Sequence, residues 1–129
     1  MTHQLNRYLI QAYFDWITDN SLTPYIVVDI SKDGVDVPEG YSKDGGIVLN
    51  IDPEATSGLD ITEDAVSFTA RFGGIETYIY APINSIRMIY AKETSQGTHL
   101  PEMEEFKNNT EDSTSENELS VKSGMRLVK

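Results

Sequence analysis

The sequence predicts a mainly β domain that begins with one α-helix, with its strands forming a strongly bent sheet or a small open barrel. Two observations support this prediction. A helical apolar pattern covers residues 5–18, and about five short segments with strand character follow it at regular spacing between turn signals. With 129 residues, the chain has room for one domain of ordinary size.

The predicted helix carries two apolar strips. The first repeats with the spacing i, i+3, i+4, i+7, and the second consists of Ile10 and Phe14. Such a helix is either sunk in its own core or covered on one side by a second copy of the chain, where Tyr8 and Trp16 would be aromatic anchors. The sequence leaves both interpretations open. The members of the first strip are Leu5, Tyr8, Leu9, Ala12, Tyr13, Trp16 and Ile17.

The predicted strands contain β-branched and aromatic residues and end at turn signals. Gly73 and Gly74 separate two of them and predict a tight hairpin. A short helical turn is expected at Asn84–Ser85, near the start of the last strand, and the polar segment 54–64 is expected to be a loop. The predicted strands are residues 25–30, 47–51, 66–72, 75–81 and 83–91, and residues 35–38 form a shorter extended piece.

The segment 66–72 alternates between apolar and polar side chains, as a strand with one apolar face does. Ala70 is a small residue on that face and leaves a notch between Phe68 and Phe72. The notch is either filled by another side chain of the core or forms the floor of a groove that admits a foreign chain. The apolar face carries Val66, Phe68, Ala70 and Phe72, and the other face carries Ser67, Thr69 and Arg71.

The chain is acidic, with 21 Asp and Glu residues against 10 Lys and Arg residues and a formal net charge of −11. Nucleic-acid affinity comes largely from Lys and Arg neutralising phosphates, so nucleic acids and anionic membranes are unfavourable partners. The absence of cysteine excludes disulfides, a thiolate nucleophile and cysteine-based metal sites. The first residues open no long apolar run, so we expect no secretory signal, no transmembrane span and a cytoplasmic location.

The sequence changes character after residue 93. Residues 94–120 are acidic and poor in apolar side chains, so we expect a flexible linker that does not pack. Residues 121–129 become basic and apolar again, which is either chance or a short docking motif on a flexible arm. The expected organisation is a domain at 1–93, a linker at 94–120 and a terminal motif at 121–129.

Candidate catalytic groups are sparse. His3 and His99 lie outside the segments that we expect to pack, and a general base needs a fixed position. Asp60 and Asp64 fit one helical face, but we expect these carboxylates to be only solvated. The glycine pairs lie in turns and form no phosphate-binding loop. We therefore expect a binding module rather than an enzyme, with no catalytic residue, no metal site and no cofactor.

Short motifs along the chain occur in the same order as in a known protein family. They are Ala12–Trp16, Asp19–Asn20, Leu22–Pro24, Val27–Asp29, Gly34–Pro38, Asp44–Gly45, Ile47–Ile51, Phe68–Gly74, Ile89–Ala91 with Glu93, and Leu127–Lys129. With these motifs the chain resembles the SspB family, the stringent starvation protein B adaptors that serve the ClpXP protease. The sequence departs from the family pattern at Tyr78–Tyr80 and in segment 54–64, and Met125 stands where a leucine is common.

The resemblance implies an Sm-like, strongly bent open barrel behind the helix, with a homodimer seam along that helix. It also implies a groove for the ssrA tag, the peptide added to products of stalled ribosomes, and a terminal motif that docks on the N-terminal domain of ClpX. The implied groove residues are Val48, Asn50, Phe68, Ala70, Arg71, Phe72 and Gly74; the docking residues are Met125, Arg126, Leu127, Val128 and Lys129; the seam residues are Tyr8, Leu9, Ala12, Tyr13 and Trp16.

A second function is compatible with the implied fold. Sm-like proteins include RNA binders, and a fold does not determine a function. An Sm-like RNA-binding or ribosome-associated protein is therefore the alternative to the adaptor, although the net charge of −11 argues against it.

Overall fold

The computed structural model describes residues 5–102 of the chain. Residues 1–4 and 103–129 lie outside the described part. The predictions that fall there concern His3, most of the expected linker and the whole terminal motif at 121–129 with its docking residues Met125–Lys129.

Helix α1 (Leu5–Asp19) confirms the predicted helix, and its two sides face different surroundings. Ile10 and Ile17 are fully buried on one side. The opposite side lies on the surface, where a helix of a monomeric domain normally carries polar residues. Among residues 5–102, no helix is long and apolar enough to cross a membrane. The large apolar side chains on the exposed side are Leu5, Tyr8 and Trp16, with exposed fractions of 61%, 47% and 41%.

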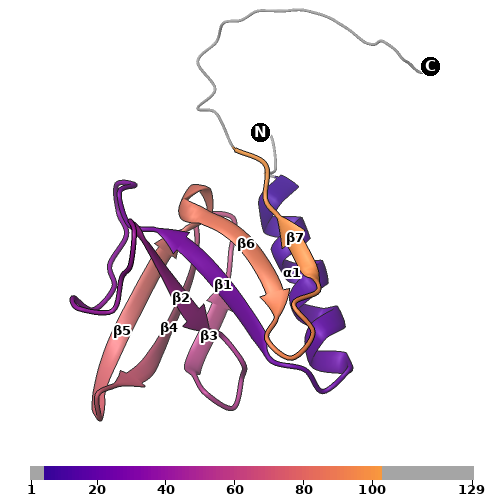
Figure 1. Cartoon of the computed structure of the whole chain (residues 1–129), viewed down its shortest axis with the longest axis horizontal. Coiled ribbons are helices and arrows are strands. Elements are labelled where there is room, and N and C mark those ends of the chain that lie inside the picture. Colours follow the sequence, from indigo (N-terminus) through magenta and orange to yellow (C-terminus); the bar gives the residue numbers. More distant parts are fainter. Residues whose placement is uncertain (1–4, 103–129) are drawn as a thin grey trace, which may run out of the picture.

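The strands in the described part form two antiparallel sheets (Figure 1). The order is β2–β1–β6–β7 in the first sheet and β3–β4–β5 in the second, and the two do not close into a barrel. The predicted mainly β fold behind one N-terminal helix is therefore confirmed. The bounds are β1 Pro24–Asp29, β2 Gly46–Asn50, β3 Ser57–Ile61, β4 Ala65–Phe72, β5 Ile75–Pro82, β6 Ile86–Ala91 and β7 Gly97–His99.

One core lies between the elements. Alternate side chains of the paired strands β1 and β2 point inward, as the burial of Ile26 and Val28 on β1 and of Ile47 and Leu49 on β2 shows. Helix α1 packs on β6, β1 and the short 3₁₀ helix η1 (Ile83–Ser85), where a helical turn was predicted. Figure 1 shows α1 beside β7 on one side of the domain and the β4–β5 hairpin on the other.

The hairpin between β4 and β5 has the tight turn that the glycine pair predicts. Gly73 and Gly74 have φ angles of 61° and 83°. A two-residue turn of this kind needs positive φ at both positions, which glycine adopts without strain. The turn fixes the register of the strands, with Phe72 opposite Ile75.

The expectation of a loop over 54–64 was wrong, because strand β3 lies within that segment. Its pairs with β4 include Ser57 with Thr69 and Ile61 with Val66. β3 lies at the edge of its sheet, and most of its side chains are at least partly exposed. An edge strand of this kind is held by backbone pairing to β4, which composition alone does not reveal.

The folded part also continues past residue 93, where the sequence placed the end of the domain. Strand β7 pairs with β6, and Leu100 beyond it is buried, with 7% of its surface exposed. Residues 94–102 therefore belong to the folded domain, contrary to the expected linker boundary. The polar composition hides this strand, because the backbone of β7 and the single apolar side chain of Leu100 make the attachment.

Candidate functional site

The β4–β5 hairpin carries a rung of small side chains between two rungs of large ones. The small rung is Ala70 opposite Thr77. Because side chains two residues apart share a face of a strand, the three rungs lie on one side of the hairpin. The notch at Ala70 therefore extends across both strands. The flanking rungs are Phe68 opposite Ile79 and Phe72 opposite Ile75.

Burial decreases along these rungs toward the tip of the hairpin. Phe68 and Ile79 are in the core, with exposed fractions of 1% and 0%. Ala70 and Phe72 are half-buried, and Ile75 is 69% exposed. The notch therefore lies where the apolar face leaves the core and reaches the surface. The ring of Phe68 has almost no exposed surface for a ligand to contact. Phe68 therefore lies beneath the notch, as part of the core, and does not line it.

Tyr41 covers part of the outer rung. Its ring meets that of Phe72 edge-on, with 5.2 Å between the ring centroids and an interplanar angle of 67°. Half of the Tyr41 surface is still exposed. Tyr41 belongs to the irregular segment 30–45 that connects β1 to β2. This segment therefore reaches from the first sheet to the hairpin of the second.

Val48 and Asn50 lie on β2, in the other sheet. Both are exposed, on the face of β2 that points away from the core, opposite Val27 and Tyr25 of β1. The Asn50 side chain accepts a hydrogen bond from the Asp52 N–H at 2.9 Å. The structure thus places the predicted groove residues on two different sheets.

Arg71 and Gly74 lie near the hairpin tip. Arg71 alternates with Ala70, so its side chain leaves the opposite face of β4, where it is exposed and lies across from Glu76. Its guanidinium donates a hydrogen bond to the Gly74 carbonyl oxygen at 3.3 Å. Arg71 therefore stiffens the turn and does not line the notch.

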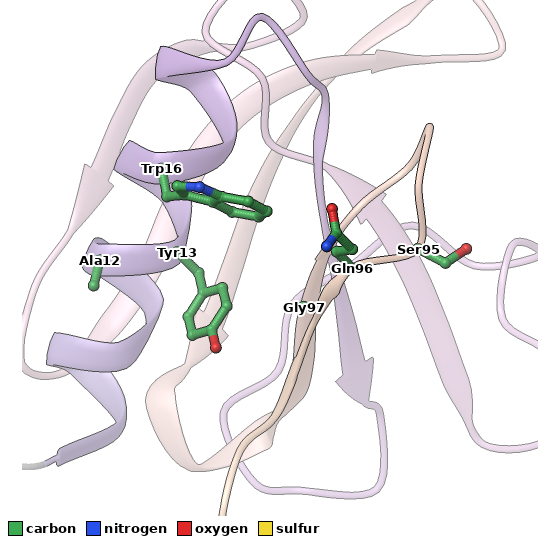
Figure 2. A pocket seen from close by; sticks show the side chains of 6 residues that line it. All are labelled: Ala12, Tyr13, Trp16, Ser95, Gln96 and Gly97. Atoms are coloured by element: carbon green, nitrogen blue, oxygen red, sulfur yellow. The ribbon is translucent and has the colours of Figure 1, made fainter.

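The exposed side of helix α1 borders a second candidate surface. A hollow of about 610 Å³ lies between the helix and the turn that leads into β7. Figure 2 shows Tyr13 and Trp16 reaching from the helix toward this turn, where Gln96 points back at them. The rings of Tyr13 and Trp16 meet edge-on, with 6.3 Å between their centroids. The predicted seam residues Tyr8, Leu9, Ala12, Tyr13 and Trp16 are all exposed or half-buried. The hollow is lined by Ala12, Tyr13, Trp16, Ser95, Gln96 and Gly97.

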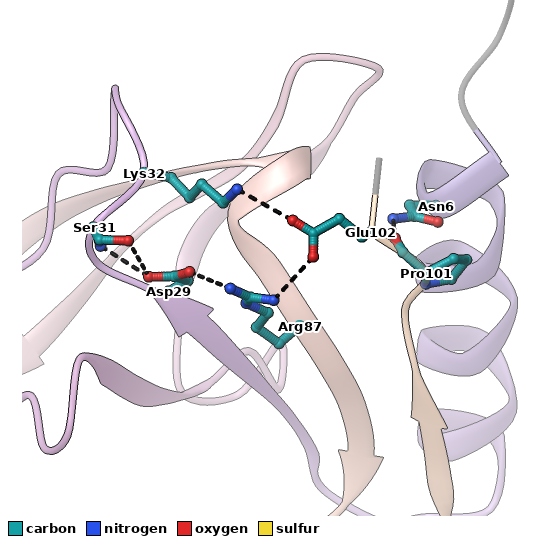
Figure 3. A network of polar contacts seen from close by, with 7 residues as sticks. All are labelled: Asn6, Asp29, Ser31, Lys32, Arg87, Pro101 and Glu102. Carbon is teal, nitrogen blue, oxygen red and sulfur yellow. Dashed lines mark hydrogen bonds and ion pairs between the residues drawn. The ribbon is translucent and has the colours of Figure 1, made fainter. Parts of the chain in front are cut away.

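Polar contacts join strands β1 and β6 to Glu102, the last described residue (Figure 3). Arg87 on β6 pairs with Asp29 at the end of β1, and it also lies 3.5 Å from Glu102. Lys32 lies 3.5 Å from the other carboxylate oxygen of Glu102. Hydrogen bonds lower the pKa of Asp29, with the bond from Ser31 the largest cause and the bond from Arg87 the next. The hydrogen bond to Asp29 raises the pKa of Arg87.

The backbone before Glu102 is held from both sides. The Leu100 N–H donates to the Arg87 carbonyl oxygen at 2.8 Å. Asn6, which is 2% exposed, donates from Nδ2 to the Pro101 carbonyl oxygen at 2.8 Å. The described end of the chain is therefore attached to both β6 and the first turn of α1.

No group of three or more His, Cys, Asp or Glu side chains within residues 5–102 could hold a metal ion. His99 lies on β7, inside the folded domain rather than outside it, and its side chain is exposed.

Sequence reasoning missed several residues of these surfaces. Thr77 could have been found, because a two-residue turn at Gly73–Gly74 places it opposite Ala70. Tyr41 left no such signal, because it lies in an irregular segment whose path the sequence does not specify. The attachment of Asn6 to Pro101 joins residues 95 positions apart, and no local pattern predicts it.

Comparison with known proteins identifies the family. A sequence model of the family described as "Stringent starvation protein B" matches residues 4–125. The chain is also similar to a "Stringent starvation protein B homolog" of Haemophilus influenzae, with 49% identity over 90 residues. That alignment covers 70% of this chain and 60% of the relative, so the chain matches less than two thirds of the relative's length. The resemblance noted in the sequence is confirmed, and the chain belongs to the stringent starvation protein B (SspB) family.

Proposed function

We propose that this protein is an adaptor that binds the ssrA tag on products of stalled ribosomes and tethers them to the ClpXP protease. The chain itself breaks no bond, and the partner protease carries out the catalysis. Because the proposed cargo comes from ribosomes, the adaptor would act in the cytoplasm.

The notch of the β4–β5 hairpin is the observation that carries this proposal. The small rung of Ala70 and Thr77 lies at the boundary between core and surface, with apolar rungs on both sides. An extended peptide could place one side chain in this gap while its backbone crosses the hairpin. Membership of the SspB family supports a peptide as the occupant.

The exposed apolar side of α1 supports the homodimer in this proposal. Tyr8 and Trp16 are large aromatic side chains on the surface, a type that is enriched among the residues that dominate binding energy at interfaces. A second copy packed along the helix would remove them from water. Each dimer would then present two terminal motifs to the protease.

The proposed ClpX contact falls on Met125–Lys129, outside the described residues. A short motif on an arm binds weakly alone, but a flexible tether raises the local concentration of its cargo to roughly the millimolar range. Two arms on a dimer would strengthen the attachment further. The motif thus needs only modest affinity for the N-terminal domain of ClpX.

Tag binding is tested with a labelled ssrA peptide and fluorescence anisotropy. Ala70→Gln fills the small rung and should weaken binding by about tenfold or more, because the peptide side chain loses its place. Thr69→Gln is the matched control, since Thr69 lies on the same strand but on the opposite face. Unchanged affinity in Ala70→Gln would rule out the notch as the binding site. Absence of binding by the natural protein would rule out the ssrA tag as the ligand.

Tethering is tested by degradation of a tagged substrate with purified ClpXP. Deletion of Met125–Lys129 should leave peptide affinity unchanged and remove the stimulation of degradation. Equal stimulation by the truncated and full-length proteins would show that these residues do not dock the adaptor.

A further inference from the structure

We infer that Tyr41 forms the outer wall of the tag groove and determines affinity for the peptide in the notch. This inference rests on the proposed function, because it takes the ssrA tag as the occupant of the groove. It adds a residue from segment 30–45 to a site that the sequence motifs place on β2 and β4.

Tyr41 contacts the rung that borders the notch on its outer side. Phe72 follows Ala70 on the same face of β4, one rung closer to the tip, and Tyr41 packs edge-on against Phe72. The notch is closed on the core side by Phe68. On the outer side, Phe72 and Tyr41 together present two rings, and aromatic rings supply large contact area at low cost in side-chain entropy.

Segment 30–45 is held in place without the Tyr41 side chain. Asp36 exchanges two backbone hydrogen bonds with Tyr80 of β5, at 2.8 and 3.0 Å. Lys43 exchanges two with Gly46 at the start of β2, at 2.7 and 3.1 Å. Tyr41 lies between these two anchors. The segment therefore carries Tyr41 to the hairpin from a fixed path, and truncating its side chain leaves both anchors intact.

The tip of the hairpin lies close to this ring. A Cβ atom added to Gly73 would lie 3.0 Å from the Tyr41 hydroxyl oxygen, a tight contact, and the positive φ of Gly73 is the stronger reason for a glycine there. Tyr41 still has half of its surface exposed while it covers Phe72. A ring that is packed on one side and open on the other has a free side for a ligand.

Tyr78 provides a matched control on the same hairpin. It is 55% exposed, close to the exposed fraction of Tyr41, which is 50%. Tyr78 lies opposite Thr69, so it projects from the face of the hairpin that does not carry the notch. A general loss of exposed tyrosine surface would affect both positions, whereas a groove wall would affect only Tyr41.

The experiment measures binding of the labelled ssrA peptide to full-length variants, with a thermal melt of each. Tyr41→Ala should weaken binding by about tenfold, and Tyr41→Phe should stay within about threefold of the natural protein because the ring is kept. Tyr78→Ala should bind as the natural protein does. Equal affinity in Tyr41→Ala, or an equal loss in Tyr41→Phe or Tyr78→Ala, would overturn the inference.

A second measurement needs no destabilising variant. In protein labelled with fluorotyrosine, the Tyr41 signal is assigned by its absence from Tyr41→Phe and should shift on addition of the tag peptide, while the Tyr78 signal stays in place. A Tyr41 signal that does not move while the peptide binds would overturn the role of Tyr41 alone. No binding to the natural protein would instead overturn the proposed function together with this inference.

Discussion

Thr23 and Glu93 lie 70 positions apart in the sequence and are joined by two hydrogen bonds to one carboxylate. The Thr23 N–H donates to Oε1 at 2.9 Å and the Thr23 hydroxyl donates to Oε2 at 2.6 Å. Thr23 precedes β1 and Glu93 follows β6, and these strands pair directly, with Pro24 opposite Ala91. The carboxylate therefore fastens the end of the central strand pair. Two of the motifs that the sequence shares with the SspB family meet at this contact.

This contact predicts that the fold loses stability in acid. Hydrogen bonds from Thr23 lower the pKa of Glu93 below its ordinary value of 4.5, and bonds from Ser31 and Arg87 lower that of Asp29. A carboxyl with a lowered folded-state pKa stabilises the fold above its unfolded pKa and loses that contribution as the pH falls. The melting temperature should therefore be nearly constant near neutral pH and decrease from about pH 5 toward pH 3.

Glu93→Gln checks the assignment of this acid sensitivity. The amide keeps the shape but not the charge, so the variant should melt lower at neutral pH and lose less on acidification. Asp60→Asn, at an exposed position on β3, is the control, and its melting temperature should depend on pH as that of the natural protein does. If the melting temperature of Glu93→Gln decreased with falling pH in parallel with that of the natural protein, Glu93 would not contribute to the acid sensitivity.

The sequence predicted those parts of the fold that local patterns encode. The helix followed from its 3.6-residue period, the hairpin from Gly73–Gly74, and the notch from the alternation around Ala70. β3 and β7 escaped prediction because both are held mainly by backbone pairing at sheet edges and carry few apolar side chains. Tyr41 was missed because its place depends on the path of segment 30–45, which is fixed by contacts with distant strands.

Gly97 should be essential for the attachment of β7. A Cβ atom at this position would overlap the Ile89 carbonyl oxygen and the Tyr90 backbone, which cannot move as a flexible side chain would. Gly97→Ala should therefore destabilise the fold by about 1–3 kcal/mol and increase hydrogen exchange in β7. Urea unfolding measures the first effect. Gly46→Ala is the control, since its added Cβ would lie at an ordinary 3.4 Å from the nearest atom. It should lower the free energy of unfolding by less than Gly97→Ala does.

The exposed side of α1 should control self-association. Introducing charge by Tyr8→Glu together with Trp16→Glu should produce a monomer without loss of helix, because these side chains lie outside the core. Light scattering after size exclusion gives the mass, and circular dichroism checks the fold. Tyr78→Glu places the same charge on an exposed tyrosine of the hairpin and should leave the mass unchanged. A dimer that survives the double substitution would remove this helix side from the seam.

Leu100 and Glu102 test what holds the described end of the chain to the domain. Leu100 is buried and Glu102 is 61% exposed at its side chain, so burial should outweigh the ion pairs to Arg87 and Lys32. Leu100→Ala should cost about 2 kcal/mol or more, because it removes packed side-chain atoms, and Glu102→Gln about 0–1 kcal/mol, because exposed pairs are screened by solvent.

Hydrogen exchange locates the effect of these two substitutions. The Leu100 N–H, which donates to the Arg87 carbonyl oxygen, should exchange faster in Leu100→Ala and nearly normally in Glu102→Gln. Added salt should weaken only the contribution of Glu102, since its pairs are exposed. A larger loss of stability in Glu102→Gln than in Leu100→Ala would instead mean that the charges around Arg87 fix this end of the chain.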